Sequence, residues 1–124
     1  MAVAYTETAA HLRERLVEGL PGRIESIVLY GSVARNEANR ESDIDILIVT
    51  RSADRKLYDK ISKIRTRIDL DSNTLTTLTQ MSRDEAERYV NLGSPFMETV
   101  LEEGIILYDT GFFKKIRGSL TPKS

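Results

Sequence analysis

Two short stretches of the sequence determine the predicted architecture: residues 30–35 read Tyr-Gly-Ser-Val-Ala-Arg, and residues 42–49 read Ser-Asp-Ile-Asp-Ile-Leu-Ile-Val. The first stretch follows an apolar run that is typical of a strand buried on both faces. Gly31 and Ser32 end that strand, and Ser32 is expected to cap the start of a helix. The second stretch leads into another apolar run, which predicts a second buried strand over 43–50.

The rest of the chain alternates between helical and strand patterns. Further helices are predicted where apolar residues recur three and four apart or where capping signals occur, namely over 6–20, 54–69, 82–89 and 94–103. Further strands are predicted over 74–81 and 105–108. The tail from about residue 110 is polar and basic, and we expect it to be weakly ordered, with a frayed helical turn followed by disorder. The whole pattern predicts one α/β domain over residues 1–124.

The composition excludes several classes of site. The 124 residues include 18 Lys and Arg and 19 Asp and Glu, which gives a formal charge of −1. The absence of cysteine excludes disulfides and thiolate chemistry. The single histidine, His11, lies in a predicted helix, which argues against a His-rich metal site and against a Ser-His-Asp triad. A charge this close to zero disfavours nucleic acid as a partner, since such binding needs clustered Lys and Arg.

The sequence contains no recognisable targeting or membrane-spanning segment. The N-terminus becomes polar at Thr6 and Glu7, too early for a signal peptide. No apolar run approaches the roughly 20 residues that a membrane span requires. We therefore expect a soluble, cytoplasmic protein. Whether copies of the chain form a homo-oligomer is left open.

Asp43 and Asp45 form the first candidate site. Residues two apart on a strand point to the same face, so the two carboxylates are expected to lie together while the isoleucines between and after them pack the other side. Two like charges at the mouth of an apolar strand repel each other, and a divalent cation removes that conflict. Mg²⁺ prefers hard oxygen ligands and typically takes one or two carboxylates together with substrate phosphates.

Gly31, Ser32 and Arg35 form the second candidate site, for an anion. Glycine allows the backbone to approach a ligand closely, and the start of a helix offers free N–H groups to a phosphate. The Ser32 hydroxyl and the Arg35 guanidinium, one turn later, could reach the same anion. A phosphate site beside a metal site is the arrangement used in metal-assisted phosphoryl or nucleotidyl transfer.

Together these residues resemble the signature of the nucleotidyltransferase superfamily that includes DNA polymerase β, in which Gly-Ser is followed by Asp-x-Asp. They resemble most closely its small single-domain members, the minimal nucleotidyltransferases. Gly31-Ser32 and Asp43-Ile44-Asp45 match the motif, and residues 94–96 and 104–109 are more weakly similar to the closing part of these proteins. The resemblance implies an α+β fold with a small mixed β-sheet flanked by helices. It also implies that Gly31 and Ser32 bind a nucleoside triphosphate and that Asp43 and Asp45 hold Mg²⁺.

Active members of this superfamily usually carry a third carboxylate on the third strand. The predicted strand over 74–81 contains no acid, so Asp69 and Asp71 are the nearest candidates. If residues 68–71 were already strand, the two side chains would share a face and could complete the site. The apolar period that runs through Ile68 instead favours the end of a helix or a turn.

These residues lead to one functional hypothesis and one alternative. The hypothesis is an Mg²⁺-dependent nucleotidyltransferase, with Asp43 and Asp45 as its catalytic residues. It would transfer a nucleoside monophosphate from a triphosphate such as ATP to a hydroxyl group and release pyrophosphate. The resemblance suggests a partner protein as the acceptor, a HEPN-type toxin. The alternative is a catalytically weak or inactive domain of the same fold that acts by binding a partner.

Overall fold

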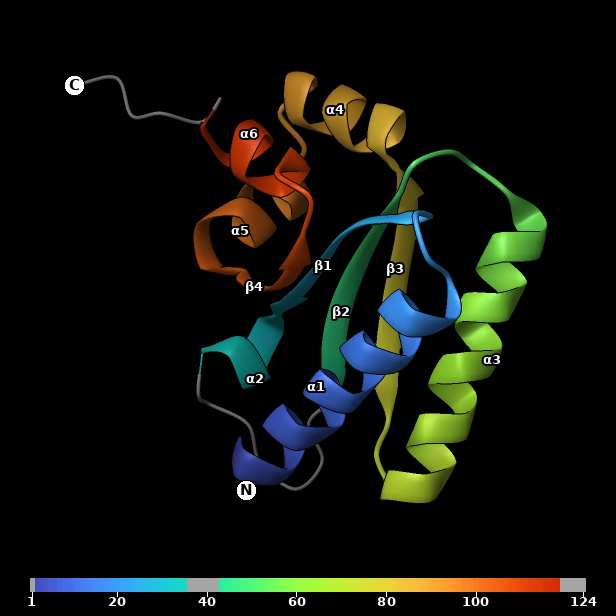
Figure 1. Ribbon diagram of the computed structural model, residues 1–124. Coiled ribbons are helices and arrows are strands. Elements are labelled where there is room, and N and C mark those ends of the chain that lie inside the picture. The colour runs from blue at the N-terminus through green and yellow to red at the C-terminus, as the bar shows by residue number, and fades with distance from the viewer. Residues whose placement is uncertain (1, 36–42, 119–124) are drawn as a thin grey trace.

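The computed structural model describes residues 2–35 and 43–118, including the side chains from Tyr5 onward (Figure 1). The helices are α1 (Ala2–Gly19), α2 (Gly31–Ala34), α3 (Arg55–Ser72), α4 (Arg83–Asn91), α5 (Pro95–Glu103) and α6 (Phe112–Gly118). The strands are β1 (Ile24–Tyr30), β2 (Ile44–Thr50), β3 (Thr76–Ser82) and β4 (Ile105–Asp109). Ser42, quoted above with the second stretch, lies outside the described residues. Within the described residues no helix is long and apolar enough to cross a membrane.

The strands form one mixed sheet in the order β3-β2-β1-β4. Strand β1 is antiparallel to both of its neighbours, β2 and β4, whereas β2 and β3 are parallel and are joined through α3. Parallel neighbours need such a crossover because the chain must return to the end of the sheet at which the first strand began. The mixed sheet flanked by helices confirms the predicted fold class.

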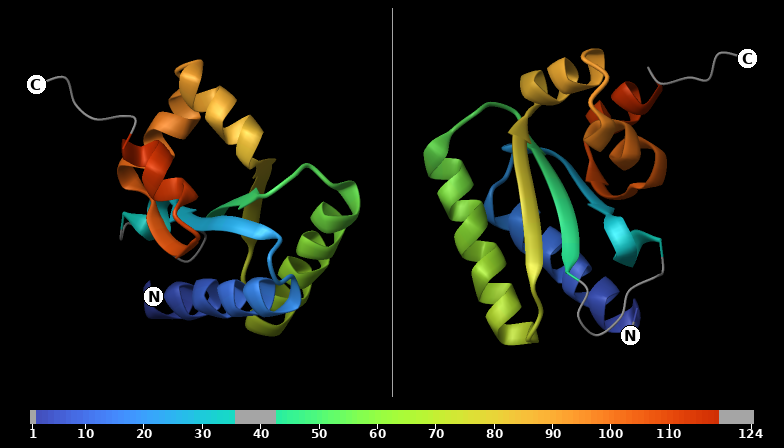
Figure 2. Two further views of the ribbon diagram at one scale, coloured as in Figure 1. Left: turned by 45° about the horizontal axis from the view of Figure 1, so that its top comes forward. Right: turned by 180° about the vertical axis from the view of Figure 1, so that it is seen from behind.

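Helices cover both faces of the sheet, as the two views in Figure 2 show. Helices α1 and α3 pack on one face, where the core includes Leu12, Leu16, Ile27, Ile46 and Ile61. Helices α4, α5 and α6 pack on the other face around Val28, Leu47, Met97, Val100 and Phe113. The two central strands are therefore buried on both faces, which explains their nearly continuous apolar sequences.

Local capping sets several of the helix boundaries. Ser82 and Glu85 form the predicted capping box of α4, and Ser94 with Pro95 starts α5 as expected. Helix α1 begins at Ala2 rather than near Thr6, so the expected cap at Thr6 is wrong. Helix α3 runs to Ser72, and Asn73 ends it in the left-handed conformation with φ of 55°.

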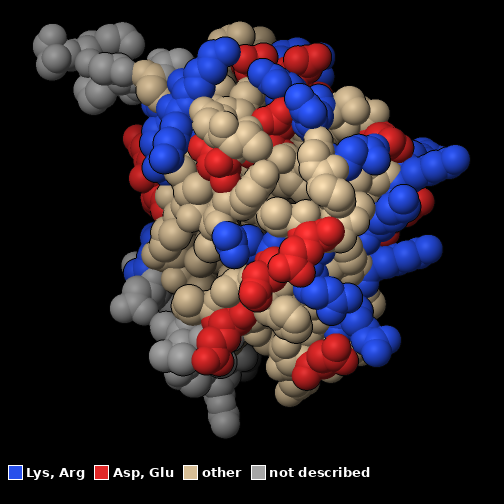
Figure 3. Space-filling view, in the orientation of Figure 1, with Lys and Arg blue, Asp and Glu red and all other residues tan. Residues whose placement is uncertain are grey.

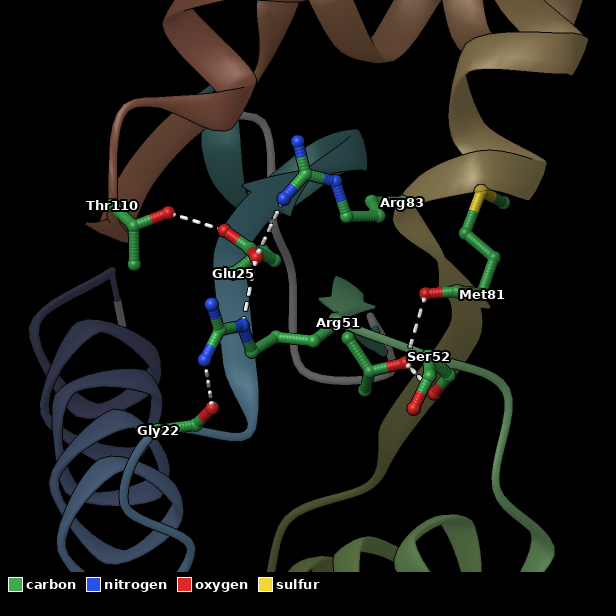
Figure 4. Close-up of polar contacts among 8 residues, drawn as sticks. Gly22, Glu25, Arg51, Ser52, Met81, Arg83 and Thr110 are labelled. Atoms are coloured by element: carbon green, nitrogen blue, oxygen red, sulfur yellow. Dashed lines mark hydrogen bonds and ion pairs between the residues drawn. The ribbon is translucent and has the colours of Figure 1, made fainter.

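A buried carboxylate joins the four strands at one end of the sheet (Figure 4). Glu25, at the start of β1, pairs with Arg51 after β2 at 3.4 Å and with Arg83 after β3 at 3.2 Å. Thr110, after β4, donates its hydroxyl hydrogen bond to the same carboxylate. Because Glu25 receives two guanidinium groups and a hydroxyl, its buried charge is neutralised within the chain.

The C-terminal tail differs from the expectation of weak order from about residue 110. Residues 112–118 form α6, and Phe112, Phe113 and Ile116 are buried. The carboxylate of Asp109 accepts hydrogen bonds from the backbone N–H groups of Phe113 at 2.9 Å and Lys114 at 3.1 Å. These three apolar residues lie on one face of the helix. The lysines and the arginine between and after them make the segment polar on average, so its composition does not reveal the apolar face.

Asp109 provides a test of this anchoring. Burial alone would raise its pKa, but hydrogen bonds from Phe113 and Ser26, together with those from Lys114 and Gly111, outweigh burial and lower the pKa. An Asp109→Asn substitution keeps the size and removes the charge. We expect it to lower the free energy of unfolding near neutral pH by about 1–2 kcal/mol, since Asp109 is partly exposed and a hydrogen bond to a charged group contributes roughly 1.5–3 kcal/mol.

The sign of the pH dependence follows from the lowered pKa. The contribution of the ionised carboxylate is complete above the unfolded-state pKa of about 3.9 and is lost as the pH falls through the lower folded-state value. The difference between wild type and Asp109→Asn in urea unfolding should therefore shrink as the solution is acidified. A difference that stays constant into the acid range would contradict this role.

Candidate functional site

The predicted site residues come together at the end of the sheet opposite Glu25. Tyr30, the last residue of β1, pairs in register with Asp45 near the start of β2, and Gly31 follows Tyr30 directly. Asp43 immediately precedes β2. In the right view of Figure 2, the start of β2 lies between the start of β3 and the short helix α2. The structure thus brings the two predicted sites, for metal and for anion, beside each other.

Gly31 is the residue that allows this approach. Its φ is +80°, which disfavours any residue with a Cβ, and a Cβ at this position would overlap Oδ2 of Asp45. Even Cγ of Asp45 would lie only 3.1 Å from such an atom. Because Gly31 has no Cβ, the Asp45 carboxylate can lie directly against the backbone at that residue.

The Asp45 carboxylate has an unfavourable electrostatic environment. Burial raises its pKa most, the negative charge of Asp43 raises it further, and the positive charge of Arg35 offsets part of the rise. Asp43 accepts a hydrogen bond from Oγ1 of Thr77 at 3.2 Å. The carboxylate pair predicted from the alternation along β2 therefore exists as an interacting pair.

Arg35 lies close enough to Asp45 for its charge to act on that carboxylate, and Ser32 follows Gly31 in α2. Nη1 of Arg35 is 3.0 Å from Oε1 of Glu103 in α5, so an ion pair orients the guanidinium. Ser32 does not cap the helix: Tyr30 is the N-cap of α2, and no side chain forms a capping hydrogen bond there. The prediction is wrong because the strand ends at Tyr30 and the helix already begins at Gly31. Ser32 is therefore inside the helix and not at its N-cap.

Asp69 and Asp71 do not join the site. Both lie in the last turn of α3, which agrees with the helix-end interpretation rather than with the strand alternative. Asp69 accepts hydrogen bonds from the hydroxyls of Thr74 at 2.8 Å and Thr76 at 2.7 Å, and from the Thr76 backbone N–H at 2.8 Å. Asp71 pairs with Arg67 on the exposed surface. Among the residues that the structure describes, no group of three or more His, Cys, Asp and Glu side chains could hold a metal ion.

Sequence reasoning missed the contribution of β3. Strand β3 runs parallel to β2 with Thr77 opposite Asp45 and Thr79 opposite Leu47. Thr77 reaches Asp43, and Thr79 lies 3.3 Å from the hydroxyl of Tyr30. The alternation of threonines in the sequence indicates a shared face, but only the pairing of β3 with β2 shows that this face carries the carboxylates.

A hollow lies next to the site on the β3 side. Its volume is about 390 Å³, and its lining residues are Thr79, Gln80, Met81, Glu85, Tyr89, Ser94 and Phe96. The ring of Phe96 meets that of Tyr30 edge to face, with 5.4 Å between the centroids. Burial raises the pKa of Tyr30, the hydrogen bond with Thr79 lowers it, and the charge of Asp45 raises it again. Tyr30 thus links the two places: it pairs with Asp45 across β1 and β2, and its side chain contacts Thr79 and Phe96, which line the hollow.

Acidic and basic side chains are separated on the face that carries α1 and α3 (Figure 3). Acidic side chains lie in a row over α1, and basic side chains project along α3. Lys56, Lys60, Lys63 and Arg67 are exposed at helical spacing on α3. Because α3 packs on the face opposite α4, α5 and α6, these basic groups lie away from the hollow.

Comparison with known proteins begins with the family model of the nucleotidyltransferase domain, which matches residues 10–107. A protein of Methanocaldococcus jannaschii, named provisionally as a protein adenylyltransferase, is 37% identical over 87 residues. That alignment covers 70% of this chain and 81% of the relative.

Solved structures share the fold at lower sequence identity. The chain matches a toxin–antitoxin crystallised with AMP-PNP at a TM-score of 0.57 and 16% identity, over 89% of this chain and 85% of the other. It also matches a complex of an MNT antitoxin with a tri-AMPylated HEPN toxin from Shewanella oneidensis at a TM-score of 0.53 and 15% identity, over 93% and 85% of the chains. The extent of the family match and the identity to the archaeal relative lead to one conclusion: this chain belongs to the nucleotidyltransferase domain family.

Proposed function

We propose that the protein is an Mg²⁺-dependent nucleotidyltransferase that transfers AMP from ATP to a hydroxyl group on a partner protein. The observation that carries the proposal is the interacting pair Asp43 and Asp45 beside the space left by Gly31. This donor set fits a divalent cation, because burial and the negative charge of Asp43 both raise the pKa of Asp45, and a bound cation would stabilise its ionised form. When bound, Mg²⁺ would neutralise phosphate charge and make the α-phosphorus more open to attack.

The residues of the chain then have separate tasks. Asp43 and Asp45 hold the cation, while the backbone at Gly31 and the Ser32 hydroxyl bind the β- and γ-phosphates. Arg35, oriented by Glu103, adds positive charge beside these phosphates. The acceptor oxygen forms a bond to the α-phosphorus, the bond from that phosphorus to the bridging oxygen breaks, and pyrophosphate leaves with the electron pair. The proton of the acceptor hydroxyl passes to solvent or to a phosphate oxygen.

In-line attack also indicates where the acceptor enters. The attacking and leaving oxygens lie on opposite sides of the phosphorus. Gly31 and Ser32 lie on the β1 side of the carboxylates, so the acceptor must approach from the β3 side. The hollow lined by Tyr89 and Phe96 is on that side and is large enough for a side chain of a partner protein. Its lining combines two aromatic rings and Met81 with polar side chains and the acid Glu85, and it contains no Lys or Arg, so it suits a protein segment better than a nucleic-acid backbone.

The names of the relatives supply the candidate reaction and partner. The archaeal relative is named as a protein adenylyltransferase, which supports ATP as the donor. The Shewanella complex contains a HEPN toxin that carries AMP groups, which supports a HEPN-type toxin as the acceptor. The alternative is a domain that is catalytically weak or inactive and acts by binding its partner. It is supported by the finding that no described residue adds a third acidic side chain to the pair Asp43 and Asp45.

A double substitution separates the two functions. With α-labelled ATP, Mg²⁺ and a HEPN-type toxin, the wild type is expected to transfer label, and Asp43→Asn/Asp45→Asn is expected to lose at least about a hundredfold of this activity. In the absence of divalent cations the same variant should gain up to about 1 kcal/mol in free energy of unfolding, because the like-charge repulsion is gone. If the wild type transfers no label and still binds the toxin as tightly as the double variant does, the domain is a binding module.

A glycine pair tests the space beside Asp45. Gly31→Ala and Gly22→Ala both place a Cβ at positive φ, since the two glycines have φ of +80° and +73°. Each should therefore lose about 1–2 kcal/mol of stability in urea unfolding. Nothing lies within 4 Å of a Cβ at Gly22, whereas at Gly31 the Asp45 carboxylate must move. Only Gly31→Ala should lose metal-dependent binding of AMP-PNP, measured by calorimetry. Equal binding by both variants would rule out this role for Gly31.

A third comparison tests the path of the acceptor. Tyr89→Ser changes the wall of the hollow, and Leu92→Ser removes a side chain that is 74% exposed and does not line it. We expect Tyr89→Ser to reduce label transfer to the toxin about tenfold while AMP-PNP affinity stays within twofold of wild type. Leu92→Ser should change neither quantity. Loss of nucleotide affinity in Tyr89→Ser would show that the hollow holds the nucleoside instead.

A further inference from the structure

Thr77 is the residue of β3 that stands beside the carboxylate pair Asp43 and Asp45, where no described acidic residue of β3 is found. It lies directly opposite Asp45 in the parallel pairing of β2 and β3, and its hydroxyl donates a hydrogen bond to Oδ2 of Asp43 at 3.2 Å. The side chain is exposed, so it does not belong to the packed core. Thr77 is thus the β3 residue whose side chain contacts the carboxylate pair, through its hydrogen bond to Asp43.

The chemistry of a hydroxyl differs from that of a carboxylate at this position. A hydroxyl can orient Asp43 through a hydrogen bond, but it brings no negative charge to a cation. Divalent cations bind more tightly as the number of carboxylate ligands in a site increases. Two carboxylates and a neutral hydroxyl therefore form a site that holds a lone divalent cation weakly and becomes strong only when phosphate oxygens are added.

We propose that Thr77 is a positioning residue that closes the metal site with a neutral hydroxyl, so that the cation binds as a complex with the nucleotide rather than before it. This inference rests on the proposed function, because it takes the metal and nucleotide sites to be adjacent. Thr77 fixes the orientation of Asp43, and the phosphates supply the remaining negative oxygens. Binding of metal and binding of nucleotide are coupled for that reason.

The experiment measures binding of Mn²⁺ by calorimetry, with and without AMP-PNP, and needs no catalysis. Wild type should bind Mn²⁺ at least about tenfold more tightly with AMP-PNP present than without it. Thr77→Asp should tighten Mn²⁺ binding about tenfold or more in the absence of nucleotide and so weaken the coupling. Thr77→Ala should weaken Mn²⁺ binding in the presence of AMP-PNP about three- to tenfold, and Thr77→Ser should restore the wild-type value.

Thr66→Asp is the matched control. Thr66 is an exposed threonine of α3, on the other face of the sheet, so this variant adds the same charge away from the site. Its Mn²⁺ affinity should equal that of wild type. Thermal unfolding gives a second measurement: Thr77→Asp should unfold at a lower temperature than wild type in chelator and recover when Mn²⁺ is added, whereas Thr66→Asp should not respond to the metal.

The outcomes separate the inference from the proposed function. If wild type binds Mn²⁺ equally well with and without AMP-PNP, or if all Thr77 variants behave alike while binding remains nucleotide-dependent, the inference is wrong and the proposed function stands. If neither wild type nor Thr77→Asp binds Mn²⁺ under either condition, both are wrong. A tighter Thr77→Asp site together with rescue by Thr77→Ser supports the assignment of Thr77.

Discussion

The repulsion between Asp43 and Asp45 is the constraint on which the site depends. The two carboxylates stand at the start of β2, whose following residues are fully buried on both faces. Burial and the neighbouring negative charge both oppose ionisation of Asp45, and Arg35 compensates only in part. A chain that needed only stability would replace one of these acids by a neutral or apolar residue, since two neighbouring like charges cost free energy of folding. The unfavourable pair therefore marks the position where a positive ligand is expected.

The opposite end of the same sheet shows how the fold treats a carboxylate that has a structural role. Glu25 is more deeply buried, yet two arginines that follow β2 and β3 neutralise its charge, and a threonine that follows β4 donates a hydrogen bond to it. At the site end, the arginine nearest to Asp45 is shared with Glu103 instead. Within the described residues, one end of the sheet is thus electrostatically complete and the other is not. This asymmetry distinguishes the structural acid Glu25 from the acids that we propose to bind a cation more directly than burial does.

The sequence allows prediction of local features and of the carboxylate pair, but not of contacts that depend on strand pairing. Apolar periodicity and capping residues predict most helices and strands correctly, because these are properties of neighbouring residues. The same local reasoning places Asp43 and Asp45 together on one strand. It cannot place Thr77 beside Asp43, since that contact joins residues 34 positions apart and depends on the register of β3. It also fails at α6, where burial against the sheet stabilises seven residues that have little helical signal of their own.

Strand β3 links the structural part of the chain to the site through its alternating threonines. Thr76 faces α3, where its hydroxyl and backbone N–H bind Asp69, and Thr77 faces the other way, toward Asp43. The hydrogen bonds that the Asp69 carboxylate accepts fix the start of β3 relative to the end of α3. They thereby help to fix which residue of β3 stands opposite Asp45. A one-residue shift would turn Thr77 away from the carboxylates and bring Thr76 or Leu78 in its place. Asp69 therefore lies apart from Asp43 and Asp45, but its hydrogen bonds help to set the strand register that brings a hydroxyl to Asp43.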